Sequence, residues 1–122
     1  MKDQNKITSS ESYQSLINDV PKIENIHQSV LAAINTEGCM LKMDEWHNCE
    51  TTHCRAGWVV HLAGERGKLL EAYTNTEFAA MQIYKASSDI NVSPMRFYAS
   101  NEDAMEDIKR CAELELKTTT EQ

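Results

Sequence analysis

The chain has 122 residues, of which 41% are hydrophobic and 25% charged, and its formal net charge at pH 7 is −7. This length and composition predict one domain with a modest core, and they exclude collagen-like, coiled-coil-rod and membrane proteins. The negative charge and the lack of a Lys/Arg cluster argue against nucleic acid and anionic membranes as partners, because both require concentrated positive charge.

The first residues, Met1 to Lys6, contain no apolar run of the kind that a signal peptide has, so we expect a cytoplasmic protein. In that reducing compartment the four cysteines are expected as free thiols rather than as a disulfide framework. They are Cys39, Cys49, Cys54 and Cys111.

The first third of the chain predicts a polar tail and two helices. Residues 1–10 are polar and are expected as a solvated tail. One short helix is expected over 11–19, and a second from Pro21 to about Asn35, since proline suits a first helical turn. Steps of three and four residues separate the apolar positions of the second helix. These positions are Ile23, Ile26, Val30 and Ile34, with His27 on the same face.

Residues 40–47 show a different period. Leu41 and Met43 alternate with Lys42 and Asp44, and a period of two is typical of a strand. A short extended or β segment is therefore expected near residues 40–47.

The pattern beyond residue 50 is helical again. Thr51 or Thr52 is placed to cap a helix over 53–63, which Gly64 and Gly67 would end.

Two more short helices are expected after these glycines. One covers 68–73 and the other runs from about 76 to 86, where Thr74 and Glu77 have the spacing of a capping box.

The end of the chain predicts one last helix. Residues 87–99 are expected to be irregular, and Ser100 is placed to cap the helix that follows. Residues 117–122 are expected as a second polar tail. The sequence therefore predicts a mainly α protein, a compact bundle of five or six short helices forming one domain over 11–116.

The most unusual segment runs from Trp46 to Trp58. It holds both tryptophans, two of the four cysteines and two of the four histidines, and His61 follows one turn later. Such crowding of rare residue types indicates a module with a structural or chemical role. Its expected structural residues are Trp46, Thr51, Thr52, Arg55, Gly57, Trp58 and His61.

Cys54 is the candidate nucleophile of this segment. In the first turn of a helix, free backbone N–H groups and the positive end of the helix dipole lower the pKa of a thiol. Helical spacing places Trp58 and His61 on the same face as Cys54.

Two neighbours of Cys54 carry separate predictions. Gly57 inside the helix costs about 1 kcal/mol relative to alanine, which indicates a segment packed closely against it, either Trp46 or the helix over 21–35. Arg55 is the one basic side chain near the helix start, where it could hold a carboxylate or a phosphate.

Metal binding is one alternative for the segment. Four borderline or soft ligands of the kind that zinc takes lie within eight residues, although two of them are adjacent and would point about 100° apart on a helix. The candidate ligands are His47, Cys49, His53 and Cys54.

Thiol chemistry is a second alternative. A nucleophilic Cys54 needs a general base, and His61 lies two turns along the same helix, out of its reach. His27 and His47 would reach it only through the tertiary fold, and a redox version would use Cys49 to resolve Cys54.

The segment also has a purely structural interpretation. Cysteine behaves as a small hydrophobe, Trp46 and Trp58 would anchor the core, and His53 would hydrogen-bond a backbone carbonyl.

The segment resembles one found in small bacterial and phage-encoded proteins that have no assigned activity. The similarity covers about 60 residues and extends through 59–65 and 97–102. It implies a module, and no substrate or cofactor. The residues that carry it are Trp46, His47, Cys49, Thr51, Thr52, His53, Cys54, Arg55, Ala56, Gly57 and Trp58.

The sequence contains no complete catalytic set and no nucleotide-binding loop. We therefore expect a non-enzymatic protein that acts by association with itself or with another protein, and that needs no cofactor. The alternative is a zinc-binding or thiol-dependent protein that uses His47, Cys49, His53 and Cys54.

Overall fold

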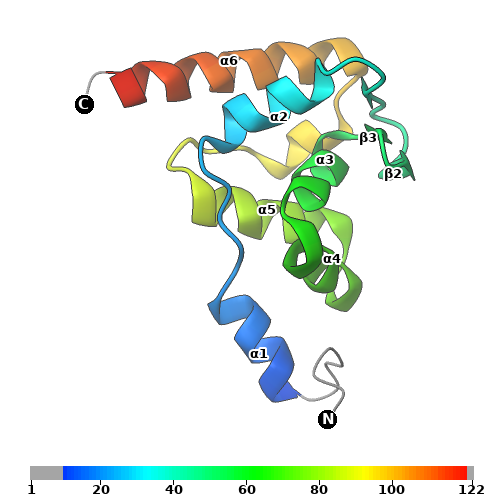
Figure 1. The fold of residues 1–122 in the computed structure, drawn as a ribbon, viewed down its shortest axis with the longest axis vertical. Helices are drawn as coiled ribbons and strands as arrows, with labels where there is room; N and C mark the ends of the chain where they lie inside the picture. Colours follow the sequence, from blue (N-terminus) through cyan, green and yellow to red (C-terminus); the bar gives the residue numbers. More distant parts are fainter. Residues whose placement is uncertain (1–9, 121–122) are drawn as a thin grey trace.

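The structure is a computed structural model that describes residues 10–120. The predicted polar tail over 1–10 therefore lies outside the described residues, apart from Ser10. Within the described part the protein is mainly α, as the sequence predicts, with one small sheet (Figure 1). The helices are α1 Ser10–Asn18, α2 Ile26–Ile34, α3 Arg55–Leu62, α4 Gly64–Tyr73, α5 Thr76–Ser87, the 3₁₀ helix η1 Pro94–Tyr98, and α6 Asn101–Thr120.

The sheet has three very short strands in the order β1-β3-β2, namely β1 Met40–Leu41, β2 His47–Cys49 and β3 Thr52–His53. β3 pairs in parallel with β1 and antiparallel with β2. The extended segment expected near residues 40–47 is therefore confirmed at β1, and the chain turns between β1 and β2.

The sheet changes how α3 begins. Because Thr52 and His53 pair within β3, the predicted caps Thr51 and Thr52 do not cap the helix, and that prediction is wrong. The cap is Cys54, whose Sγ accepts a hydrogen bond from the backbone N–H of Gly57 at 3.3 Å. α3 therefore begins two residues later than expected, directly at the edge of the sheet.

α3 lies in the middle of the molecule and packs against α2, α4 and α5 (Figure 1). Six of its residues are buried, including Ala56, Val59 and Val60, none of which is exposed at all. Cys54 and Trp58 are 1% and 2% exposed. α3 is therefore the central buried helix of the described residues.

α2 and α6 lie side by side along one face of the molecule (Figure 1). α2 begins at Ile26 and not at Pro21, because the N–H of Ile23 donates to Ser87 Oγ and Asn25 takes a left-handed conformation with φ 52°. α6 continues to Thr120, so residues 117–120 extend the helix instead of forming a tail.

Three smaller predictions concern caps and glycines. Ser100 Oγ accepts from the N–H of Asp103, as expected for the cap of α6. The predicted capping box at the start of α5 is wrong, because Asn75 makes the cap by accepting from Phe78 N–H at 2.8 Å. Gly64, with φ 75°, marks the break between α3 and α4, whereas Gly67 lies within α4.

α1 packs against α4 at the opposite end of the molecule from α6 (Figure 1). None of the helices over 10–120 combines the length and the apolar character that crossing a bilayer requires.

Candidate functional site

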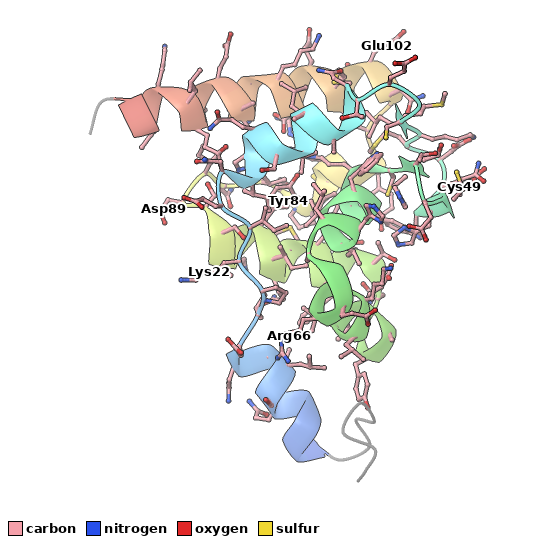
Figure 2. The ribbon with its side chains drawn as sticks, viewed as in Figure 1. Lys22, Cys49, Arg66, Tyr84, Asp89 and Glu102 are labelled. Atoms are coloured by element: carbon pink, nitrogen blue, oxygen red, sulfur yellow. The ribbon has the colours of Figure 1, made fainter. Side chains whose placement is uncertain are left out.

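An open pocket of about 440 Å³ lies where β2 and β3 meet α3 and α4. The sheet contributes two histidines and a cysteine, and the two helices contribute a third histidine, a lysine and a glutamate. Figure 2 shows Cys49 at the outer edge of the molecule beside β2. The pocket is lined by His47, Asn48, Cys49, Glu50, His53, His61, Lys68 and Glu71.

A chain of hydrogen bonds crosses this pocket. His47 Nε2 lies 2.7 Å from Glu71 Oε2, and His47 Nδ1 lies 2.7 Å from His53 Nδ1. His53 Nε2 lies 3.0 Å from the carbonyl oxygen of Glu50. The chain therefore ends at a carboxylate on α4 and at a backbone carbonyl next to the sheet.

The donors and acceptors of this chain set the number of hydrogens that it needs. The Glu50 carbonyl and an ionised Glu71 can only accept, so each contact to them takes its hydrogen from a ring Nε2 atom, and the contact between the two Nδ1 atoms takes one more. Two neutral imidazoles carry two hydrogens. For all three contacts to be hydrogen bonds at once, the chain needs a third hydrogen, on a ring or on Glu71.

The two rings of this chain have different surroundings. Burial lowers the pKa of His53, and the neighbouring rings of His47 and His61 lower it further, although the hydrogen bond to the Glu50 backbone opposes this. His47 contacts the Glu71 carboxylate, whose Oε2 also accepts from the Thr76 hydroxyl at 2.6 Å. His47 and Glu71 are thus a hydrogen-bonded acid–base pair at the pocket wall.

His61 completes a cluster of three imidazoles. Its ring stacks on that of His53 with a centroid distance of 4.7 Å, and its Nδ1 lies 3.8 Å from Glu50 Oε1. Beneath His53 lies Trp58, at 4.6 Å between centroids, and the indole N–H donates to the Met40 carbonyl at 3.0 Å. The predicted anchor Trp58 therefore supports the floor of the pocket.

The two cysteines of the segment have opposite environments. Cys49 is exposed, and hydrogen bonds from the hydroxyl and backbone of Thr51, followed by those from Thr52, lower the pKa of its thiol. Cys54 is buried, and burial raises the pKa of its thiol although backbone N–H groups of α3 oppose this. The predicted reactive thiol at Cys54 is thus in the wrong environment, and the accessible low-pKa thiol is Cys49.

The predicted metal ligands do not converge as they stand. His47, Cys49 and His53 line one pocket, but Cys54 is buried as the cap of α3, and both ring nitrogens of each histidine already make hydrogen bonds. Within the described residues no group of three or more His, Cys, Asp and Glu side chains is arranged to hold a metal ion.

Trp46 and Gly57 meet directly. A Cβ added at position 57 would overlap the carbonyl oxygen of Trp46, so Trp46 is the close neighbour that the glycine indicates. The Trp46 side chain, however, is 39% exposed and does not anchor the core.

Arg55 holds a carboxylate of its own chain. Its side chain is entirely buried and donates to Asp107 at 2.6 Å and to the Tyr84 hydroxyl at 2.9 Å. Figure 2 shows Tyr84 in the interior of the molecule. Arg55 is therefore a structural link among α3, α5 and α6 rather than a ligand-binding cation.

Sequence reasoning missed the contribution of α4. Lys68 and Glu71 lie outside the Trp46–Trp58 segment, and Glu71 reaches His47 across 24 positions. No spacing rule links residues that are so far apart, and only the packing of α4 against α3 brings them to the pocket.

No family model matches the chain, and neither a curated protein nor a solved structure matches it.

Proposed function

We propose that this is a thiol-dependent protein whose working group is Cys49. The observation that supports this most directly is the position of an exposed thiol with a lowered pKa in one pocket with three imidazoles. Thiolate is the reactive form of cysteine, and a neighbouring acid–base group is what such a nucleophile requires. We place this activity in the cytoplasm, in keeping with the sequence.

The proposed chemistry is substitution at a carbon atom that bears a leaving group. An imidazole of the pocket accepts the Cys49 proton, and the thiolate lone pair then forms a carbon–sulfur bond. The electron pair of the broken bond leaves with the departing group, which takes the proton back from the imidazole. His61 is suited to this exchange, because its contact with Glu50 is long, at 3.8 Å. The ring nitrogens of His47 and His53, by contrast, make shorter hydrogen bonds.

Alkylation by iodoacetamide tests the proposal, followed for each cysteine by mass spectrometry between pH 5 and 9. We expect Cys49 to react about tenfold faster than the half-buried Cys39 at neutral pH, with a midpoint below that of an ordinary thiol. His61→Gln should reduce the rate at neutral pH, and Cys49→Ser should abolish the fast phase.

Cys39 serves as the control within the same chain, and Cys54 should remain unmodified until the protein unfolds. A Cys49 that reacts no faster than Cys39, with the midpoint of a free thiol, contradicts the proposal.

Association is a second candidate function. Large hydrophobic side chains are exposed near β1, β2 and η1, with Met40 56%, Trp46 39% and Tyr98 68% exposed. Such groups are enriched in protein interfaces. Sedimentation velocity over a hundredfold concentration range tests self-association: Trp46→Ser should weaken it, and a chain that stays monomeric throughout contradicts it.

A further inference from the structure

A second pocket, of about 520 Å³, adjoins the first at Glu71. Its walls come from the loop before β2, from the end of α4, from the start of α5 and from η1. It is lined by Trp46, Glu71, Ala72, Asn75, Thr76, Glu77 and Tyr98. A volume of this size accommodates a long side chain or a small organic molecule.

Two exposed aromatic rings form a corner of this pocket. The planes of Trp46 and Tyr98 lie at 81° to each other, with 6.1 Å between ring centroids. Exposed aromatic faces carry negative electrostatic potential, and they attract cations that come within about 6 Å of the ring.

Two carboxylates reinforce that preference. Glu77 Oε1 accepts a short hydrogen bond from the Tyr98 hydroxyl, which ties the carboxylate to the aromatic wall. Glu71 uses Oε2 for both His47 and Thr76. Among the residues that the structure describes, none that lines this pocket is lysine or arginine. The described lining therefore presents acceptors and aromatic faces.

We propose that this pocket binds a guanidinium group, in which Trp46 and Tyr98 supply the aromatic faces and Glu71 and Glu77 accept hydrogen bonds. A guanidinium is planar, stacks on aromatic rings and offers paired N–H donors to carboxylates, so it uses both features, whereas a quaternary ammonium uses the rings alone. The group can belong to a small molecule or to an arginine of a peptide. Binding does not depend on Cys49.

NMR titration of the ¹⁵N-labelled chain tests this inference with Nα-acetyl-arginine amide as the probe. The signals to follow are the Trp46 indole N–H and the backbone N–H groups of 75–78, with the buried Trp58 indole as an internal control. Nα-acetyl-citrulline amide has the same shape without the charge, and we expect it to bind about tenfold more weakly.

Variants separate the contributions. Trp46→Leu and Glu77→Gln should each weaken binding of the arginine probe about fivefold. Phe78→Leu is the matched control, because Phe78 is an exposed aromatic residue that does not line the pocket. Cys49→Ser should bind the probe unchanged, which separates this result from the outcome of the alkylation experiment.

Ethylguanidinium distinguishes the two sources of the ligand. If it binds as tightly as the blocked arginine, the pocket takes the guanidinium alone, as from a small molecule; if it binds more weakly, peptide groups add contacts. Equal binding of arginine and citrulline probes, or shifts that persist in the Trp46→Leu Glu77→Gln double variant, would overturn the inference.

Discussion

Glu71 sets the donor at one end of the imidazole chain. As a carboxylate it only accepts, so His47 Nε2 supplies the hydrogen of that contact, and His47 or His53 supplies the one between the two rings. An amide at position 71 would instead donate to His47 Nε2, so that two neutral rings complete the chain.

Glu71→Gln should therefore move the hydrogen of His47 from Nε2 to Nδ1 while keeping the contact to His53. Side-chain ¹⁵N shifts of the histidines measure this directly. Glu71→Ala is the control, since it removes the contact without offering a donor. An unchanged His47 spectrum in Glu71→Gln would contradict this exchange of donor and acceptor.

The close approach of the Trp46 backbone requires glycine at position 57, and helix propensity alone does not explain this residue. At an open helical site, glycine to alanine stabilises by about 1 kcal/mol. At position 57 the new Cβ would overlap the Trp46 carbonyl and lie 3.0 Å from His53 Cβ.

Gly57→Ala should therefore destabilise the protein by about 1–3 kcal/mol, measured by urea unfolding, because the loop before β2 has to move. The signals of His47 and His53 should shift as well. A variant more stable than the wild type would contradict the close approach.

At the scale of elements, α2 depends on α6 for its cap. Asn25 makes no side-chain cap, and the carboxylate of Glu115 accepts from the backbone N–H groups of His27 at 3.1 Å and Gln28 at 2.8 Å. A negative charge at a helix N-terminus is stabilising.

Glu115→Gln should lower the free energy of unfolding by about 1 kcal/mol, since one acceptor oxygen and the charge are lost. Glu113→Gln, an exposed site on the same helix, should change it by less than about 0.5 kcal/mol. Equal effects of the two substitutions would show that the cap contributes nothing.

These elements show where sequence reasoning succeeds and stops. The periodic spacing of Ile26, Val30 and Ile34 identifies α2, and Ser100 identifies the start of α6, because both signals are local. The cap by Glu115 is not local, and the start of α3 depends on strand pairing between residues 12 positions apart. Contacts of this range come from the packed fold, so no window of sequence contains them.

The same limit applies to the pocket. Its histidines and Cys49 stand out by composition alone, but their roles depend on the folded surroundings. Hydrogen bonds from Thr51 and Thr52 lower the pKa of the exposed Cys49 thiol, whereas burial raises the pKa of Cys54, which caps α3. The contact of Glu71 with His47 depends on the packing of α4 and could not be predicted from the sequence.

At the scale of the whole molecule, one buried ion pair joins three helices. Arg55 of α3 contacts Asp107 of α6 and Tyr84 of α5, and Arg110 also donates to Asp107 at 2.7 Å. Burial opposes ionisation of Asp107, but the hydrogen bonds from both arginines keep the pKa of its carboxyl below the ordinary value.

Asp107→Asn should cost about 3–5 kcal/mol, because it leaves the fully buried Arg55 without a counter-charge. Arg55→Met should cost less, since Asp107 retains Arg110 and lies 3.5 Å from Arg96. Urea unfolding of the two variants ranks them, and the reverse order would contradict the assignment of Arg55 as the more dependent partner.

Burial of His27 makes the stability of the protein depend on pH. Burial lowers the pKa of His27 to about 4, with Arg55 and Arg110 adding to this effect and Glu115 and Asp107 opposing it. In the unfolded chain His27 has the ordinary histidine pKa of about 6.5, so it binds a proton more readily there than in the folded protein. The stability that neutral His27 contributes is therefore complete above about pH 6.5 and is lost as the pH falls towards 4. The loss reaches about 3 kcal/mol.

His27→Phe isolates this contribution. The ring of His27 stacks on Tyr84 at 5.2 Å, which phenylalanine preserves. His27 Nε2 is buried and has no hydrogen-bond partner among the residues that the structure describes, so the substitution removes no described bond at that atom. Relative to wild type, the variant should lose about 3 kcal/mol less between pH 6.5 and 4 in urea unfolding, because every other titratable group is present in both chains. Parallel stability curves would contradict a neutral, buried His27.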